Sequence, residues 1–169
     1  MATMQKIISN LWFDQQAEDA VKFYTSVFEN SRIVKTAYYG NEGQEAHGMP
    51  EGTVMTIEFE LEGQTFLALN GGPHFQFNEA ISFIINCDTQ EEIDYYWNKL
   101  SEGGDEKAQM CGWLKDQYGL SWQVVPRTLD DMMTDEDKEK PARVMKAMLQ
   151  MKKLDLETLK QAYEGPVTA

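Results

Sequence analysis

The side chains that most often hold a metal ion or move a proton are few in this chain. It contains two histidines, His47 and His74, and two cysteines, Cys87 and Cys111. The cysteines lack the C-x-x-C spacing of a zinc or redox motif. Both histidines fall in segments whose composition predicts loops, so we interpret them as loop histidines rather than ligands. We expect both thiols to be buried and reduced in an intracellular protein.

Carboxylates are abundant, but their spacing does not indicate an acid–base pair. Glu58 and Glu60 alternate with apolar residues, which predicts that they face solvent or a partner. The chain has 28 acidic and 15 basic residues, a net charge of −13. Part of the acidity lies in two runs, Glu42–Glu51 and Asp130–Glu139, which we interpret as solvated surface.

The negative charge also bears on the partners and the location of the protein. It disfavours binding to phosphate backbones and to anionic membranes, so we expect neither nucleic acid nor membrane as a partner. The sequence shows no signal peptide and no apolar run of membrane-spanning length. We therefore expect a cytoplasmic location.

The elements that would position any site occur twice along the chain. In the first copy, from Ile7 to about Asn70, the residue pattern predicts a strand, a helix and three further strands. The second copy, which starts at Ala80, repeats this order. The predicted spans are strand Ile7–Phe13, helix Ala17–Phe28 and strands Ser31–Tyr39, Val54–Leu61 and Gln64–Asn70, then strand Ile81–Cys87, helix Gln90–Leu100 and short strands around Ala108–Cys111, Gly112–Asp116 and Ser121–Val125.

The two predicted helices align position by position at an offset of 73 residues: Ala20 with Ile93, Phe23 with Tyr96, Tyr24 with Trp97 and Val27 with Leu100. Their apolar residues recur at three- and four-residue spacing, as on one face of a helix. One such unit cannot bury both faces of its sheet. We therefore predict two half-domains that complete one another in a curved sheet with a cleft, where a small molecule can bind.

Two further segments lie outside the repeat. The connection Gly71–Asn78 breaks regular structure but contains Phe75 and Phe77, which we expect to pack against something. After Arg127 the chain is methionine-rich. The spacing of its apolar residues there predicts helices at Leu129–Met133, Pro141–Lys152 and Leu156–Tyr163. We interpret the methionines as core. The alternative is an adaptable lid or a dimer surface.

Several motifs together resemble one family. The run Cys111–Pro126, CGWLKDQYGLSWQVVP, is its most specific part, and Leu11–Phe13, Ala17–Ala20, Phe23-Tyr24, Asn70–Pro73, Ala80–Phe83 and Asp88–Asp94 agree with it. The chain resembles the PhnB-like family, which is also labelled 3-demethylubiquinone 3-methyltransferase-like. This family lies in the vicinal oxygen chelate superfamily of glyoxalases, bleomycin-resistance proteins and dioxygenases. The resemblance spans almost the whole chain, including the Val144–Leu156 tail.

The resemblance implies an α+β fold in which two tandem βαβββ modules form a U-shaped mixed sheet around a cleft, usually in a homodimer. Residues 1–126 would form the paired modules, with module one at 5–72 and module two at 79–126. Residues 127–169 would form a C-terminal helical extension.

The resemblance also implies where a metal would bind in related proteins. Metal-using members carry His and Glu ligands on the first strand and on a late strand of each module. Here Gln123 stands at the last-strand position. The first-strand candidates are Ile8, Ser9 or Asn10 in module one and Ile81 or Ser82 in module two. We therefore predict no metal and no other cofactor. A weakly bound Mg²⁺ or Ca²⁺ held by oxygen atoms is the alternative.

The resemblance then leaves a metal-free pocket lined by amide, hydroxyl and aromatic side chains: Asn10, Trp12, Asn70, Ser82, Trp113 and Gln123. Such a lining suits a planar or amphipathic small molecule, and an acidic cleft would favour a cationic one. Strand alternation points Trp122 away from Gln123, which predicts that Trp122 is core. Trp12 and Trp113 could lie in the core or in the pocket.

We therefore predict a small-molecule-binding protein. The alternative is an enzyme, either a metal-dependent lyase or dioxygenase or the methyltransferase that the family label names. Asn70–Pro73 does not lead into a helix as a cofactor-binding glycine loop does, so the sequence gives methyl transfer no physical support. A further alternative is an interaction role for the helices after Arg127.

Overall fold

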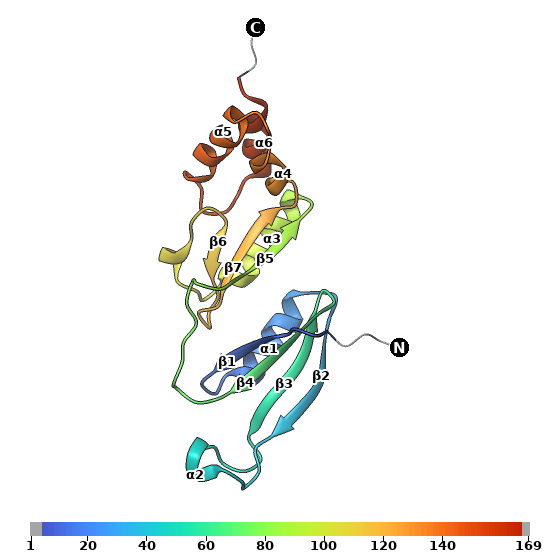
Figure 1. Ribbon diagram of the computed structural model, residues 1–169, viewed down its shortest axis with the longest axis vertical. Helices are drawn as coiled ribbons and strands as arrows, with labels where there is room; N and C mark the ends of the chain where they lie inside the picture. The colour runs from blue at the N-terminus through green and yellow to red at the C-terminus, as the bar shows by residue number, and fades with distance from the viewer. Residues whose placement is uncertain (1–4, 167–169) are drawn as a thin grey trace. The chain divides into compact units, whose positions relative to one another are not determined.

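The computed structural model describes residues 5–166, so the outer ends of the predicted ranges, 1–4 and 167–169, lie outside the described residues. The chain forms two compact units, the first ending at Phe77 and the second beginning at Asn78. Each unit has its own mixed sheet with a helix against it (Figure 1). The predicted α+β class is confirmed. None of the helices among the described residues is long and apolar enough to cross a bilayer.

Unit 1 is a four-stranded sheet covered on one face by a helix. Its elements are β1 (Ser9–Phe13), α1 (Ala17–Val27), β2 (Ser31–Tyr38), α2 (Gln44–His47), β3 (Val54–Leu61) and β4 (Gln64–Asn70). The strand order is β1-β4-β3-β2, with β1 parallel to β4 and the other pairs antiparallel. Glu62 and Gly63 both have positive φ, as a two-residue hairpin between β3 and β4 requires.

The core of unit 1 lies between α1 and the sheet. The apolar face of α1 is buried, and Tyr24 on it stacks on Phe59 of β3 with ring centroids 6.4 Å apart. Full burial of a large apolar side chain stabilises the fold by about 1.5–3 kcal/mol. The expectation that the connection packs is confirmed within this unit, because Phe77 lies edge-on to Phe13 at 5.2 Å.

Unit 2 repeats the strand–helix–hairpin part of unit 1 and then adds helices. Its elements are β5 (Ser82–Cys87), α3 (Gln90–Ser101), a 3-10 turn η1 (Glu106–Ala108), β6 (Trp113–Lys115), β7 (Ser121–Pro126), α4 (Leu129–Met133), α5 (Glu139–Met148) and α6 (Leu156–Glu164). The strand order is β5-β7-β6. β5 and β7 are parallel, like β1 and β4, and β6 and β7 are antiparallel, like β3 and β4.

Two local predictions are wrong. The strand expected over Ala108–Cys111 is replaced by the turn η1 and one isolated bridge between Met110 and Trp113. Here Cys111 and Gly112 have positive φ, and their N–H groups donate to the carbonyls of Met151 and Lys152 rather than to a sheet partner. The loop expected over Gly40–Gly52 contains the short helix α2, which ends at His47.

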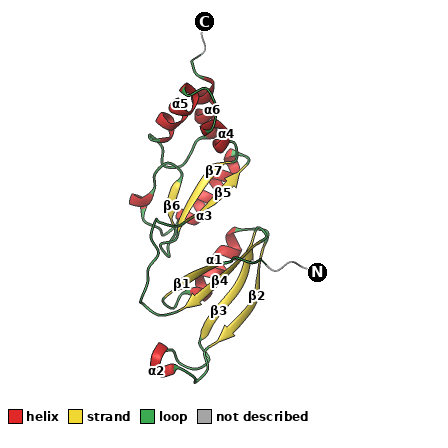
Figure 2. Ribbon diagram, viewed as in Figure 1, coloured by secondary structure: helices red, strands yellow, loops and turns green. Residues whose placement is uncertain are grey.

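The helices α4, α5 and α6 lie together at the C-terminal end of unit 2 (Figure 2), around a small core to which β7 and the connection before α6 also contribute. Its buried members are Val125, Met132, Val144, Leu154 and Leu159, and Met133, Met148 and Met151 pack around them. The interpretation of the methionines as core is confirmed for these residues. The exception is Met145, whose side chain is 42% exposed.

Side-chain hydrogen bonds tie this helical extension to the rest of unit 2. The amide of Gln90 on α3 donates to the carbonyl of Leu154 at 3.2 Å and accepts from the N–H of Leu156 at 2.8 Å. Within the extension, Asp135 accepts from the hydroxyl of Tyr163 and pairs with Lys140, whose ammonium also lies over the Tyr163 ring. The buried apolar core and the hydrogen bonds and ion pair at its edge together stabilise the extension.

Candidate functional site

Three of the predicted site residues meet on one face of the unit 2 sheet, which we call the open face because α3 covers the other. Gln123 donates from Nε2 to the Oγ of Ser82, at 2.9 Å. Trp113 is the direct partner of Gln123 across the β6–β7 ladder, so the two side chains share this face. All three are half-buried. Ile84, on the same face, is 57% exposed. The open face therefore combines an amide, a hydroxyl and an aromatic ring beside exposed apolar surface.

A fourth residue of the open face was not predicted. Ser121 lies two residues before Gln123 on β7 and pairs with Ser82 across the β5–β7 ladder. It is 1% exposed, and its Oγ has no hydrogen-bond partner among the described residues. A buried hydroxyl without a partner costs about 1–3 kcal/mol. Such a group in a folded protein indicates that a water molecule or a ligand satisfies it.

An ion pair lies beside this cluster. Lys115 is the ladder partner of Ser121 on β6, and its Nζ lies 2.6 Å from Oε1 of Glu79. The hydrogen bond from Lys115 lowers the pKa of the Glu79 carboxyl, so Glu79 carries its negative charge at neutral pH. Because the two charges offset one another, the pair gives the open face no strong preference for a charged ligand.

Trp12 and Asn10 share one face of the unit 1 sheet, opposite the α1 side. The indole Nε1 of Trp12 donates to the carbonyl of Gly72 at 2.9 Å, and Phe75 lies edge-on to the ring at 4.9 Å. A Cβ on Gly71 would overlap the indole of Trp12, so the ring needs a glycine there. Asn10 is exposed. Trp12 is half-buried and is held in place by the connection that follows β4.

Asn70 has an internal role. Its Oδ1 accepts from the N–H of Ala17 at the start of α1, at 2.9 Å, and its Nδ2 donates to the carbonyl of Val54 at 3.1 Å. It is 7% exposed and lies at the edge of a cavity of about 710 Å³ that is also lined by Met49 and Thr53. The amide thus supplies the helix start with a partner, because Gln16 at the N-cap makes no side-chain cap bond.

The residues at the implied metal positions do not fit such a metal. Ser82 and Gln123 offer one hydroxyl and one neutral amide, which bond to each other. Within residues 5–166, no group of three or more His, Cys, Asp or Glu side chains could hold an ion. His47 accepts from the N–H of Met49 at Nδ1 and its ring lies tilted against Tyr39, and His74 lies beside Trp12. Both histidines are therefore placed by local contacts.

The cysteines differ from each other. Cys87 is buried and Cys111 is half-buried, and both are free thiols. The prediction that both are buried is therefore wrong for Cys111, which lies in the left-handed turn beside Met151. Burial raises the pKa of the Cys87 thiol to about 12, with Glu92 and Asp88 adding to the effect. Cys87 therefore stays protonated and is a poor nucleophile or ligand at neutral pH.

Comparison with known proteins identifies the family of this chain. A family model described as 3-demethylubiquinone-9 3-methyltransferase matches residues 5–125. The chain belongs to this family. The resemblance to the PhnB-like family that the motifs predict is thereby confirmed, and the match covers both repeats up to β7.

Solved structures agree. A PhnB protein from Bacillus cereus is 37% identical with a TM-score of 0.61, and the match covers 72% of this chain and 99% of that one. A protein from Pseudomonas aeruginosa shares the fold at 19% identity and TM-score 0.56, over 72% and 96% of the two chains. A glyoxylase/bleomycin resistance protein/dioxygenase domain from Frankia also matches, at 11% identity and TM-score 0.46, over 73% and 98%. No curated protein matches the chain significantly.

The signal that could have identified Ser121 is present in the sequence. Residues two apart on a strand share a face, so Ser121 must accompany Gln123 wherever that side chain points. What the sequence does not show is that its hydroxyl is buried without a partner. The prediction that Trp122 is core is confirmed, because it is 3% exposed and its Nε1 donates to Asp116.

Proposed function

We propose that this protein binds a small molecule on the open face of the unit 2 sheet, through Ser82, Ser121 and Gln123, with Trp113 as an aromatic wall. The observation that carries the proposal is the buried Oγ of Ser121, which has no hydrogen-bond partner among the described residues and lies next to the Ser82–Gln123 bond. The hydroxyls of Ser82 and Ser121 and the amide of Gln123 can each donate and accept hydrogen bonds. A ligand group that does both would satisfy Ser121.

The surroundings narrow the ligand class. Trp113 and the exposed Ile84 favour a planar or apolar body, and the hydroxyl–amide cluster favours one polar group on it. The opposite charges of Lys115 and Glu79 already offset one another, so neither attracts a charged ligand strongly. We therefore propose a neutral, planar, amphipathic ligand. On the unit 1 sheet, Asn10 and Trp12 remain proposed small-molecule contacts, whereas the internal bonds of Asn70 support a structural role for that residue.

A ligand screen tests the proposal through thermal stability. A panel of planar amphipathic compounds, with quinones and phenols among them, is added to the full chain and the midpoint Tm is measured. Ligand at about 100 times its Kd stabilises the fold by about 2.7 kcal/mol. For a chain of this length, that raises Tm by roughly 5–10 °C. If no compound in the panel shifts Tm, the proposal is wrong.

The variant Ser121→Ala tests the site itself. Removal of the unpartnered hydroxyl should leave the free protein as stable or more stable, by up to about 1 kcal/mol, because the desolvation cost of the hydroxyl disappears. The same variant should reduce the Tm shift caused by a ligand. Ser26→Ala is the matched control, since Ser26 is an exposed serine on α1. An unchanged ligand shift in Ser121→Ala would move the site away from the open face.

The second candidate function is catalysis, which the family description favours because it names methyl transfer. The connections before the two sheet-covering helices, Asp14–Gln16 and Asp88-Thr89, contain no glycine and cannot form the glycine-rich loop of a dinucleotide-type cofactor site. The test is methyl transfer from S-adenosylmethionine to a catechol-type acceptor. Elemental analysis of the metal-replete protein tests the metal-dependent alternative. One divalent ion per chain, with turnover that is lost on chelation, would place catalysis ahead of binding.

The homodimer remains part of the proposal. The mass of the protein in solution, measured by light scattering after size exclusion, distinguishes a chain of 19.4 kDa from a pair of chains.

A further inference from the structure

The helical extension, residues 127–169, has 8 basic and 9 acidic side chains, but one segment of it is strongly basic. Residues 138–153 contain six basic side chains and one acidic one, a local net charge of +5 in a chain whose net charge is −13. This segment includes α5 and the connection to α6. Basic amphipathic helices are typical of surfaces that bind acidic partners. This basic segment is independent of the ligand site proposed on the open face.

Half of these basic groups are engaged within the protein. Lys140 pairs with Asp135, and Lys153 pairs with Asp94 at 2.7 Å. Arg143 donates from Nε to the carbonyl of Ala162 and from a terminal nitrogen to that of Tyr163, both at 2.8 Å, so it caps the end of α6.

The remaining three basic groups, Lys138, Lys146 and Lys152, are exposed and have no ion pair within residues 5–166. At about 1.5 Å per helical residue, Lys138 and Lys146 lie about 12 Å apart along α5. Uncompensated positive charge is therefore spread along the helix instead of being gathered at one point.

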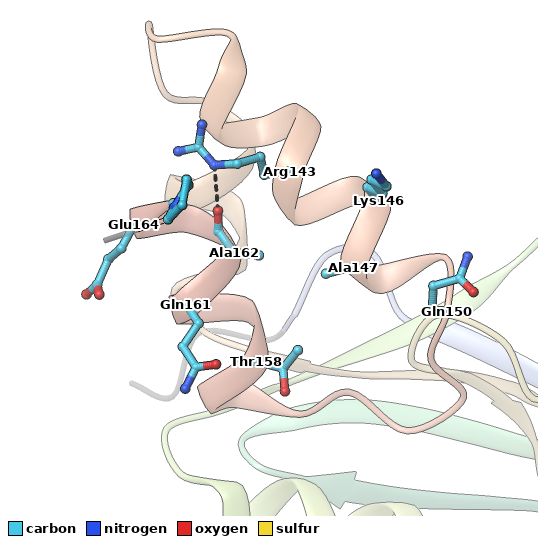
Figure 3. A pocket seen from close by; sticks show the side chains of 10 residues that line it. Arg143, Lys146, Ala147, Gln150, Thr158, Gln161, Ala162 and Glu164 are labelled. Carbon is cyan, nitrogen blue, oxygen red and sulfur yellow. Dashed lines mark hydrogen bonds between the residues drawn. The ribbon is translucent and has the colours of Figure 1, made fainter. Parts of the chain in front are cut away.

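A groove lies between α5 and α6 beside these charges, and we call it the α5–α6 groove. Its volume is about 850 Å³, and Ala147 and Ala162 contribute small apolar side chains from the two helices. Figure 3 shows Arg143 and Lys146 on α5 and Gln150 just beyond its end, with Thr158, Gln161 and Glu164 along α6. Met145 on α5 and Leu149, its C-cap residue, lie outside the lining of the groove and are 42% and 60% exposed. Small side chains between two helices let a partner approach closely, and exposed apolar residues supply contact area.

We propose that the α5–α6 groove binds an acidic peptide segment of a partner protein, with an apolar residue of that segment seated in the groove. Charge complementarity selects the acidic partner, and the spread of the free lysines from the N-cap of α5 to the connection beyond it favours a segment of several residues over a small anion. The Glu164 carboxylate would repel acidic residues, so the acidic part of the segment lies at the Lys146 end.

Other occupants fit the charges less well. Antiparallel pairing of α5 with α5 of a second copy would bring two segments of net charge +5 together. Nucleic acid and anionic bilayers present extended negative surfaces, and the remaining 153 residues of the chain, with 27 acidic and 9 basic side chains, oppose them. A short peptide engages the basic helix without meeting the rest of this surface.

The test measures the fluorescence anisotropy of a labelled peptide of about 14 residues, which spans about 21 Å as a helix. Its sequence places glutamate and leucine at helical spacing, and a control peptide replaces each glutamate with glutamine. We expect saturable binding of the acidic peptide to the full chain, weaker binding of the control peptide, and loss of binding at about 0.5 M salt. Absence of saturable binding would overturn the proposal.

Four variants separate a site from general attraction. Lys146→Glu should weaken binding about three- to tenfold, because an attraction becomes a repulsion. Lys22→Glu is the matched control, since Lys22 is an exposed lysine on α1 of unit 1 and should bind like the wild type. Leu149→Ser should weaken binding through lost apolar contact, and Glu164→Gln should strengthen it.

Two outcomes contradict the proposal even when the peptide binds. Equal losses in Lys146→Glu and Lys22→Glu would show that only the overall charge matters. Sedimentation with phosphatidylglycerol vesicles that is stronger than peptide binding, and that also depends on Lys146, would assign the surface to a membrane instead. Circular dichroism of each variant confirms that the fold is intact, which is expected because all four side chains are exposed.

Discussion

Replacement of Asn70 by alanine should destabilise the protein in the absence of any ligand. In the folded chain the Asn70 amide bonds to the N–H of Ala17 and to the carbonyl of Val54, both in a buried setting. The alanine variant leaves these two groups without the amide, at about 1–3 kcal/mol each. We expect a total loss of about 3 kcal/mol. For a chain of this length, Tm should fall by about 6–12 °C.

The assay is thermal unfolding followed by circular dichroism, with urea unfolding as a second measurement of the free energy. Asn10→Ala is the matched control, because the exposed Asn10 makes no hydrogen bond through its side chain within the described chain. Its effect should stay within about 0.5 kcal/mol. If Asn70→Ala melts with the wild type but loses ligand binding, Asn70 serves the ligand rather than the fold, and the reasoning from its two bonds is refuted.

Three further predictions concern the fold and its ionisable groups. Gln90→Ala should cost about 2 kcal/mol and lower Tm by about 4–8 °C, because it removes the bonds to Leu154 and Leu156; a melt equal to that of the exposed-site control Gln161→Ala would contradict this. The hydrogen bond from Tyr163, with Asp137 and Lys140, lowers the pKa of Asp135 from 3.8 to about 2. Asp135 therefore stabilises the fold above about pH 4 and loses this contribution as the pH falls towards 2, so urea unfolding of wild type and Asp135→Asn should converge across that range. Cys87, whose pKa is raised to about 12, should resist iodoacetamide at about pH 8 in the folded protein and react after unfolding. Mass spectrometry of the Cys111→Ser variant detects the modification of Cys87. Equal reaction rates in the folded and unfolded states would disprove the protection of this thiol by the fold.

Local patterns in the sequence were sufficient for most helices and strands. The predicted Val54–Leu61 and Gln64–Asn70 have the observed bounds of β3 and β4, and the predicted helix starts at Ala17 and Gln90 are the observed starts of α1 and α3. These elements follow from apolar periodicity and turn residues, which depend on neighbours within a few positions. The offset of 73 between the helices likewise indicated the repeat.

Local patterns were insufficient where a distant backbone competes for a segment. The Ala108–Cys111 stretch reads as a strand, but the carbonyls of Met151 and Lys152 bind the N–H groups of Cys111 and Gly112. The backbone of this stretch therefore bonds to the helical extension instead of continuing the sheet. The residue types within 108–111 do not indicate that the N–H of Cys111 bonds to the carbonyl of Met151, 40 positions away.

The sequence by itself determined the family, the α+β class, the repeated strand–helix order and the amide, hydroxyl and aromatic residue types available for a site. The tertiary structure decided which polar side chains are already engaged. The bond from Ala17 to Asn70 spans 53 residues, and that from Gln123 to Ser82 spans 41. Only the folded chain therefore shows that Asn70 holds the start of α1, while Ser121 is buried with an unpartnered hydroxyl. A hydrogen bond needs two groups in register and at the right distance, and this is fixed by the pairing of strands far apart in sequence.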